Sequence, residues 1–154
     1  MALVEPSLTD KIGILKFERP GKQNSLSREL MGLMADTLDS LVAEGAHVIV
    51  IRTIPGVKVW SAGHDITELP EPRRDPLGYA DPLETLLRKI QDCPVPVIAM
   101  VEGSVWGGAC DLCFSCDMVI AAEGSKFAMT PAKIGIPYNA SGLIHFTNLI
   151  GVNK

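Results

Sequence analysis

The sequence lacks a long hydrophobic run and any surplus of positive charge. None of its apolar stretches reaches the roughly 20 residues that a membrane-spanning helix needs, and the N-terminus has no basic start followed by a long apolar core. The net charge is -4, which gives no general affinity for nucleic acid or for an anionic membrane, and the pair Arg73-Arg74 is too short to form a basic patch. We therefore expect a soluble, cytoplasmic protein that binds neither nucleic acid nor a membrane.

Cysteines are few, and three of the four stand in a pattern that needs separate treatment. Cys110, Cys113 and Cys116 are spaced C-x-x-C-x-x-C, which superficially resembles the ligand run of an iron–sulfur cluster. On a helix, however, residues three apart lie on nearly one face, where thiols pack as small hydrophobic groups. Cys93 is distant in sequence. We rank buried, reduced thiols above a metal site, a disulfide or a redox role, and we expect no metal.

Internal repeats and low-complexity tracts are absent, and 154 residues that are 47% hydrophobic suffice for one domain with a substantial core. Strands are expected over residues 12–17, 47–52, 97–101 and 118–122, and helices from Ser27 to Gly45, from Asp81 to Pro94, from Gly107 onward and from Gly142 to Lys154. This alternation predicts an α/β fold with parallel strands and crossover helices. The run at 47–52 is apolar on both faces, which predicts a sheet covered by helices.

Local signals refine this outline. Ser27 and Asp81 are expected to cap helices, with Pro82 in the first turn of the second and Glu84 as the reciprocal carboxylate of a capping box. Residues 69–76 are polar and proline-rich, which predicts a surface loop that could act as a mobile lid. The first helix carries an apolar stripe that we assign to the core, namely Leu30, Met31, Leu33, Met34, Leu38, Leu41 and Val42.

Two segments rich in small residues lie where an apolar run meets a helix start. They are residues 60–66, Trp-Ser-Ala-Gly-His-Asp-Ile, and residues 103–111, Gly-Ser-Val-Trp-Gly-Gly-Ala-Cys-Asp. Small residues let a ligand approach bare backbone, and the N–H groups of a first helical turn point outward as donors. In open α/β folds, ligands usually bind beyond the carboxyl ends of the strands, where both segments fall. Two such junctions can hold one carbonyl oxygen, as an oxyanion hole does.

These two segments resemble those of the crotonase superfamily, the enoyl-CoA hydratase and isomerase family. Further marks follow in the family's order, namely Arg19-Pro20, residues 24–26, Cys116-Asp117, and Phe127 with Pro131 and Gly135. The resemblance covers nearly the whole chain. It implies a spiral core of ββα units with parallel strands, in which residues 1–154 form an acyl-CoA-binding core that lacks the family's C-terminal helical region. Where that region is present, a homo-trimer or hexamer is expected.

The resemblance also implies a site. The backbone N–H groups of His64 and Gly108 would hold the thioester oxygen of an acyl-CoA, and Tyr138 would lie near a free carboxylate of the substrate. The segment around Ala62 would receive the adenine of CoA through backbone atoms, and Lys22 would contact a CoA phosphate. The expected CoA contacts are Lys22, Ser25, Leu26, Ala62 and Ile66. Coenzyme A enters as part of the substrate, with no other cofactor.

Departures from the hydratase pattern decide the expected reaction. Family hydratases use two glutamates to add water across a double bond, and the matching positions here are Asp111 and Ala132. Half of the acid–base pair is therefore missing, although Asp111 remains a candidate catalytic carboxyl. Residues 61–70, 101–109 and 129–139 resemble instead those of family members that decarboxylate a malonyl-type thioester, methylmalonyl-CoA to propionyl-CoA, through an enolate.

Each candidate residue also has a structural interpretation. The imidazole of His64 is inert if only its amide is used, and Asp65 equally fits a helix cap. Tyr138 and Asp111 fit packing or scaffold roles. Ordinary structural or surface roles are assigned to His47, His145, Trp60 and Trp106.

Two other functions stay open. One is a different enzyme of the same family, such as a hydratase, an isomerase or a thioesterase, which the side chains opposite the oxyanion hole would distinguish. The other is a non-catalytic remnant that binds CoA or associates with full-length relatives. An exposed apolar surface would favour the second, because helices packed there in relatives would leave it uncovered here.

Overall fold

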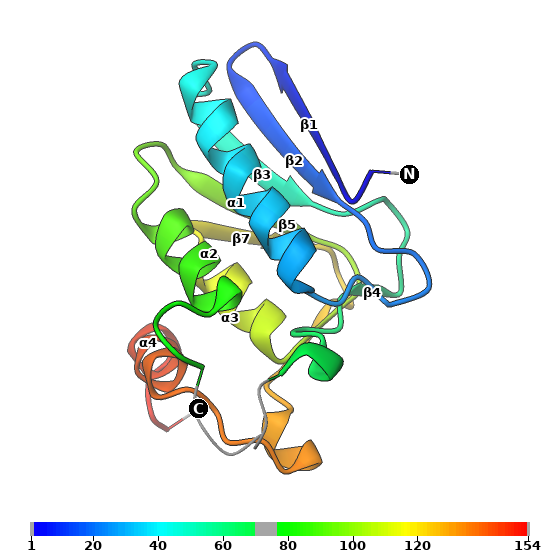
Figure 1. Cartoon of the computed structure of the whole chain (residues 1–154), viewed down its shortest axis with the longest axis vertical. Coiled ribbons are helices and arrows are strands. Elements are labelled where there is room, and N and C mark those ends of the chain that lie inside the picture. The colour runs from blue at the N-terminus through cyan, green and yellow to red at the C-terminus, as the bar shows by residue number, and fades with distance from the viewer. Residues whose placement is uncertain (1, 70–76, 154) are drawn as a thin grey trace.

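The structure is a computed structural model that describes residues 2–69 and 77–153 (Figure 1). Of the predicted lid at 69–76, all but Leu69 lies outside the described residues. The main sheet has five strands in the order β1-β2-β3-β5-β7. Their bounds are Val4–Thr9, Ile12–Phe17, Val48–Arg52, Val97–Val101 and Met118–Ala121. The four strands predicted from the sequence are confirmed to within a residue at each end.

The first strand was not predicted. β1 pairs antiparallel with β2, whereas the other strands of the main sheet pair in parallel. The turn between them is made by Asp10 and Lys11, whose φ angles of 50° and 65° are those of a tight hairpin turn. β1 has no strict alternation and contains Pro6, which an edge strand tolerates because one side of it needs no ladder hydrogen bonds.

The helices that connect the strands lie on one face of the main sheet, where α1 and α2 run side by side (Figure 1). The helix bounds are Arg28–Ala43 for α1, Pro82–Gln91 for α2, Gly108–Ser115 for α3 and Ala140–Ile150 for α4. The parallel strands follow one another in a single direction across the sheet, so right-handed crossovers put every connecting helix on the same side. The predicted covering by helices is therefore found on one face only. On the other face, Ile14, Val50 and Ile98 are half-buried and Met118 is 54% exposed.

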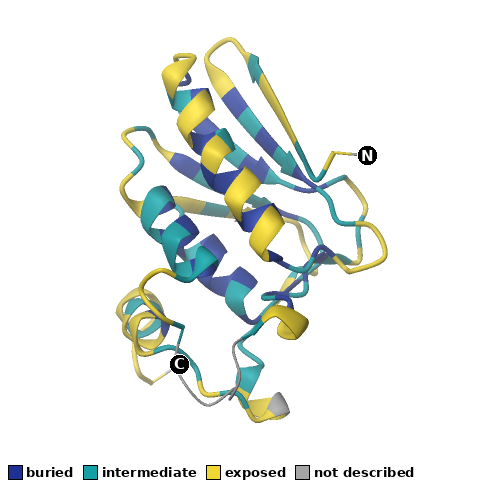
Figure 2. Ribbon diagram, in the orientation of Figure 1, coloured by how far each residue is buried: buried dark blue, intermediate teal, exposed yellow. Residues whose placement is uncertain are grey.

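The core lies between this sheet and its helices (Figure 2). The sheet contributes alternate residues of its strands, and α1 and α2 contribute their apolar stripes. The largest buried side chains are Leu15, Phe17, Leu26, Leu30, Met31, Met34, Leu38, Leu41, Ile49, Ile51, Trp60 and Leu86. The Ser27 cap is confirmed, since its side chain accepts a hydrogen bond from the Leu30 N–H at 3.2 Å. Leu33, assigned to the core from its spacing, is 41% exposed and points away from it.

A second, smaller sheet joins β4, β6 and β8 in parallel. The bounds of these strands are Val59–Ser61, Ser104–Trp106 and Lys126–Ala128. Each follows a strand of the main sheet and precedes a helix, so β3-β4-α2, β5-β6-α3 and β7-β8-α4 are successive ββα units. The expected ββα spiral is thus confirmed. The sequence does not predict these short strands, because three residues carry almost no periodicity.

The end of the described chain forms α4, after a 3-10 turn at Pro131–Ile134. α4 packs on α3, where the rings of Phe114 and Phe146 lie 5.4 Å apart between centroids. Gly142 is its only buried residue. Large apolar side chains are exposed on α4 and on β7 and β8, namely Leu143, Ile144, Leu149, Ile150, Met118, Ile120 and Phe127. Within the described residues, no helix is long and apolar enough to cross a bilayer.

Candidate active site

The two glycine junctions meet in space at the carboxyl ends of β4 and β6, the small-sheet strands they follow. A Cβ on Gly63 would lie 2.4 Å from the carbonyl oxygen of Trp106 and 3.1 Å from the amide nitrogen of Gly108. Gly63 also has a φ of 86°, and Gly107 caps α3 with φ 53° and ψ -128°, conformations that favour glycine. Glycine at these positions therefore allows the two backbone segments to touch.

This contact brings the amides of His64 and Gly108 close together. A Cβ on Gly108 would lie 3.6 Å from the His64 nitrogen. Among the described residues, neither of these two N–H groups donates a hydrogen bond, whereas the neighbouring Asp65 N–H donates to Leu26 and the Gly107 N–H donates to Ala128. Because no described protein group accepts from them, these two half-buried amides can donate to a ligand oxygen.

A cavity of about 110 Å³ opens beside these amides. Its wall contains most of the residues predicted for the site, namely His64, Gly108, Asp111, Tyr138, Ala62 and Ile66. The remaining lining is largely apolar and comes mostly from α2 and the 130–139 segment, with Leu69, Leu77 and Gly107 in addition. The fold therefore gathers residues that are far apart in the sequence, from Ala62 to Asn139, around one space.

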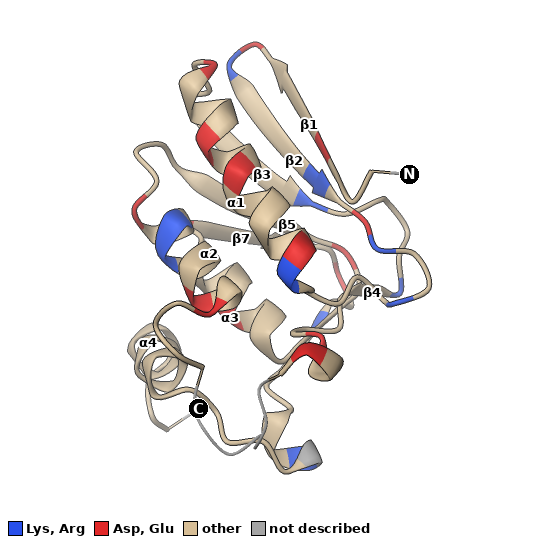
Figure 3. Ribbon diagram, in the orientation of Figure 1, with Lys and Arg blue, Asp and Glu red and all other residues tan. Residues whose placement is uncertain are grey.

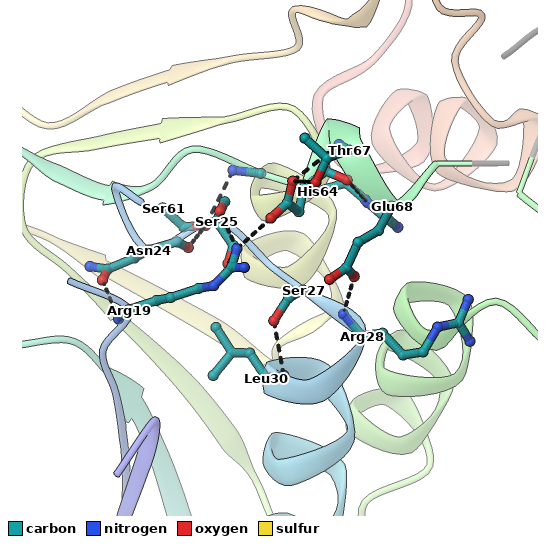
Figure 4. Close-up of polar contacts among 12 residues, drawn as sticks. Arg19, Asn24, Ser25, Ser27, Arg28, Leu30, Ser61, His64, Thr67 and Glu68 are labelled. Carbon is teal, nitrogen blue, oxygen red and sulfur yellow. Dashed lines mark hydrogen bonds and ion pairs between the residues drawn. The ribbon is translucent and has the colours of Figure 1, made fainter. Parts of the chain in front are cut away.

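The turn before α1 braces the segment that carries His64 (Figure 4). The Ala62 N–H donates to the Gln23 carbonyl at 3.0 Å, and the Ser61 hydroxyl donates to the Asn24 carbonyl at 2.7 Å. The Asn24 side chain donates in turn to the Trp60 carbonyl at 3.1 Å. Because Gln23 and Asn24 both have positive φ, this turn is specifically shaped to lie against residues 60–63.

Three predicted CoA contacts, Lys22, Ser25 and Leu26, lie in this turn and not in the cavity wall. Lys22 is exposed, and the Ser25 hydroxyl accepts a hydrogen bond from Arg19 at 2.7 Å. Leu26 is fully buried, and its N–H and carbonyl pair with Gly63 and Asp65 on either side of His64. Leu26 therefore fixes the position of the His64 amide.

Asp65 has the role of a cap, the structural alternative that its sequence position allowed. Its side chain accepts from the Thr67 N–H at 3.1 Å and from the Thr67 hydroxyl at 2.7 Å, and it pairs with the Arg19 guanidinium at 2.5 Å. These contacts, that of Arg19 above all, lower the pKa of Asp65 to about 2. The ion pair joins the two segments that meet at Leu26.

The imidazole of His64 faces the start of α2. Its Nδ1 lies 3.1 Å from the Asp65 carbonyl oxygen, and its buried Nε2 lies 3.7 Å from Asp81 Oδ1, an ion-pair distance beyond hydrogen-bond range. Burial opposes a charge on this ring, but the Asp81 carboxylate and the Asp65 carbonyl outweigh it and raise the pKa of His64. Likewise, burial opposes the charge on Asp81, but His64 and the Leu83 N–H outweigh it and lower the pKa of Asp81.

Asp111 and Tyr138 meet on the other side of the cavity. A Cβ on Gly142 would lie 2.8 Å from Tyr138 Cε1 and 2.9 Å from Asp111 Oδ1, so the three residues are in contact. Burial raises the pKa of Asp111 to about 6, with Glu84 adding to the effect while Tyr138 and His145 oppose it. Burial and the nearby Asp111 raise the pKa of Tyr138, whose buried hydroxyl has no hydrogen-bond partner among the described residues.

Glu84 lines the cavity, although its sequence position predicts a capping box with Asp81. It does not complete a capping box with Asp81, because the Asp81 N–H donates to the Gly78 carbonyl instead. The Asp81 cap itself is confirmed, through its side chain and the Leu83 N–H at 2.8 Å. Glu84 accepts from Asn139 and from the Ser141 hydroxyl, across the cavity from its own helix. No spacing signal in the sequence links residues 55 positions apart.

The cysteines and His145 occupy structural positions, although His145 also lowers the pKa of Asp111. Cys110 and Cys113 are buried and Cys116 is partly buried, and burial raises the pKa of each thiol. No group of His, Cys, Asp and Glu suited to a metal ion occurs within residues 2–69 and 77–153. His145 lies 2.6 Å from the Phe114 carbonyl oxygen through Nε2, which fits the structural role predicted for it.

Comparisons with known proteins agree with the family resemblance of the sequence. The sequence matches the family described as "Enoyl-CoA hydratase/isomerase" over residues 8–154. Methylmalonyl-CoA decarboxylase of Escherichia coli (strain K12) is 44% identical over 142 residues, which cover 92% of this chain and 54% of that protein. The mitochondrial enoyl-CoA hydratase domain-containing protein 3 of Danio rerio is 34% identical over 136 residues, which cover 84% of this chain and 46% of that protein.

The fold agrees with these matches. A crystal structure of methylmalonyl-CoA decarboxylase complexed with 2S-carboxypropyl CoA has a TM-score of 0.90 at 43% identity, over 96% of this chain and 56% of that chain. The chain spans about half the length of the curated relatives it matches. The match of sequence over nearly the whole chain and the match of the ββα spiral lead to one conclusion: the chain belongs to the enoyl-CoA hydratase/isomerase, or crotonase, family.

Proposed function

We propose that the cavity binds an acyl-CoA thioester and decarboxylates a malonyl-type acyl group, converting methylmalonyl-CoA to propionyl-CoA. The observation that supports this most is that the N–H groups of His64 and Gly108 lie beside one cavity and donate no hydrogen bond to a described residue. The similarity to the methylmalonyl-CoA decarboxylase of Escherichia coli supports the choice of acyl group.

The reaction needs a site for negative charge on oxygen. The bond between the α-carbon and the carboxylate carbon breaks, and its electron pair moves into the thioester carbonyl as carbon dioxide leaves. The enolate oxygen that forms would accept from the His64 and Gly108 N–H groups. Removing one such donor typically costs about 2.7–4 kcal/mol in the barrier, so two can supply much of the acceleration.

The opposite side of the cavity supplies a phenol and a carboxyl group. The buried Tyr138 hydroxyl, without a protein acceptor among the described residues, can donate to the substrate carboxylate and hold it out of the enolate plane. The α-carbon then needs a proton. Asp111, with a pKa of about 6, retains its proton more readily than an ordinary aspartic acid and is the group we assign to deliver it.

Two observations keep other functions as candidates. Glu84 and Asp111 both line the cavity, so a pair of carboxyl groups is available for hydratase or isomerase chemistry despite Ala132. The exposed apolar side chains of β7, β8 and α4 favour association with another protein surface instead. α4 carries no Lys, Arg, Asp or Glu, as Figure 3 makes plain.

The test is mass spectrometry of the purified chain incubated with methylmalonyl-CoA, beside a control without protein. Propionyl-CoA above the control supports the proposal and shows that this chain suffices. Hydration of an enoyl-CoA in a parallel incubation, without propionyl-CoA in the first, would replace it with hydratase chemistry. A folded chain that turns over neither compound would leave CoA binding or association as its function. A trimeric or hexameric assembly and a cytoplasmic location stay predictions.

A further inference from the structure

Glu84 links the two sides of the cavity. It stands in the first turn of α2, and Oε1 accepts hydrogen bonds from the Asn139 side-chain amide and, at 3.3 Å, from the Ser141 hydroxyl. The Asn139 amide also donates to the Ser141 hydroxyl at 2.8 Å. These three side chains form a closed triangle at the N-terminus of α4. The Asn139 side chain makes no capping bond to α4 itself, so its contact with Glu84 is a tertiary one.

This triangle is adjacent to the residues that face a ligand. Tyr138 directly precedes Asn139, and Gly142 follows Ser141 by one residue. Tyr138 lines the cavity beside Asp111, and Gly142 lies against the Asp111 carboxyl. The triangle thus holds the chain at the point where it passes over Asp111.

We propose that Glu84 is a positioning residue of this site, which holds the segment carrying Tyr138 against Asp111 by accepting hydrogen bonds from Asn139 and Ser141. This inference rests on the proposed function for its chemical meaning, since a ligand must use Tyr138 or Asp111 for their placement to matter. The contacts themselves stand on the structure alone.

The charge of Glu84 gives it a second effect on the same site. Besides burial, three groups shift the pKa of Asp111, namely Glu84 on α2, His145 on α4 and Tyr138. Of these three, only Glu84 raises that pKa. Among the described residues that line the cavity, none is a lysine or an arginine. Glu84 therefore favours the protonated form of Asp111, which is the form that can donate a proton.

Two substitutions separate the two effects. Glu84→Gln keeps an acceptor oxygen for Asn139 and Ser141 but removes the charge, and Glu84→Ala removes both. Glu29→Gln is a matched control, because Glu29 also stands in the first turn of a helix but is exposed and remote from the cavity. Each variant of the full chain is first checked for folding by its thermal transition.

The first readout is amide hydrogen exchange over residues 138–150. We expect exchange to rise about tenfold or more in Glu84→Ala, since hydrogen bonds to a charged group are lost, and to stay near the wild-type rate in Glu84→Gln and Glu29→Gln. Wild-type exchange in a folded Glu84→Ala chain would overturn the proposal. If Glu84→Ala does not fold, Asn139→Ala removes the same contact from the other side, and unchanged exchange there overturns it equally.

The second readout is the titration of Asp111 by carbon-13 NMR of labelled aspartate, with the resonance assigned by its loss in Asp111→Asn. We expect the titration midpoint to fall in both Glu84 variants and to stay unchanged in Glu29→Gln. If the titration midpoint of Asp111 is the same in Glu84→Gln as in the wild type, the proposed effect of the Glu84 charge on Asp111 is wrong. Neither readout uses turnover, so a chain that forms no propionyl-CoA would sink the proposed function while leaving the role of Glu84 to be decided by exchange and titration.

Discussion

The two sides of the cavity are built very differently. The first wall, residues 61–66 with 107–110, is mostly buried apart from Ile66 and is tied by backbone hydrogen bonds to residues 23–26 and to Ala128. The second wall, residues 130–150, is mostly exposed in Figure 2 and has Gly142 as the one buried residue of α4. Its polar ties to the rest of the described chain include Glu84 with Asn139 and Ser141, and His145 with Phe114.

This difference in burial and anchoring fits two separate tasks, the stabilisation of developing charge and the choice of acyl group. Donors that stabilise developing charge work best when they are fixed before the ligand arrives, and the first wall fixes the amides of His64 and Gly108. The second wall carries Tyr138, which lines the cavity and which we propose faces the acyl group of the substrate. We infer that the oxyanion site is a property of the fold, whereas the choice of acyl group depends on a less strongly anchored surface.

The largest expected effect follows from the first wall. Gly63→Ala places a Cβ 2.4 Å from the Trp106 carbonyl at a φ of 86°, so the wall must open. We expect the free energy of unfolding to fall by about 2–4 kcal/mol in denaturant titrations. Gly21→Ala is the control, because its φ of 73° is similar but nothing lies within 4 Å. Equal losses in the two variants would show that the contact of the two junctions is not tight.

Next in size is an effect on rate. Asp111→Asn keeps the volume of the side chain but removes the proton that we assign to the enolate. We expect kcat for propionyl-CoA formation to fall about a hundredfold while the affinity for propionyl-CoA changes little. Steady-state kinetics and calorimetry measure the two quantities. An unchanged rate would reduce Asp111 to a scaffold residue.

The second wall is tested by Gly142→Ala. Its Cβ would lie 2.9 Å from Oδ1 of Asp111 on α3, which must push α4 outward from α3. Hydrogen exchange in α4 is expected to rise about tenfold with little change in global stability, because this wall opens locally. Gly32→Ala has nothing within 4 Å on α1 and serves as the control. Global unfolding of Gly142→Ala would mean that the two walls form one cooperative unit.

Tyr138→Phe tests the specific use of this wall. Removing the hydroxyl leaves the ring in place, so we expect decarboxylation to slow about tenfold and CoA-thioester binding to change less. Parallel losses of rate and affinity would contradict a role in orienting the substrate carboxylate.

The smallest effect concerns the Arg19–Asp65 pair beside the first wall. The pKa of Asp65 is lowered from 3.8 to about 2, so its contribution to stability is complete above pH 3.8 and is lost as pH falls toward 2. We expect this contribution to be on the order of 1 kcal/mol and to disappear from the acid unfolding curve of Asp65→Asn. A curve identical to that of the wild type would show that the pair adds no stability.

The sequence predicted the scaffold and the glycine junctions better than the second wall. Strand periodicity at 12–17 and 97–101, helix caps at Ser27 and Asp81, and paired glycines at 107–108 are local signals that survive folding. The three-residue strands, the one-sided covering of the sheet and the exposure of Leu33 depend on topology, which spacing does not carry. The contact of Glu84 with Asn139 could not be predicted, because the sequence position of Glu84 also fits a capping box.

The most direct test of the account is isotope-edited infrared spectroscopy of propionyl-CoA labelled with carbon-13 at the thioester carbonyl. Donation from the His64 and Gly108 N–H groups weakens the carbonyl bond, so the account predicts that its stretching band moves to lower frequency when the compound is bound to the chain. A bound thioester whose carbonyl absorbs at the frequency it has in water, or no binding by the folded chain, would contradict the account.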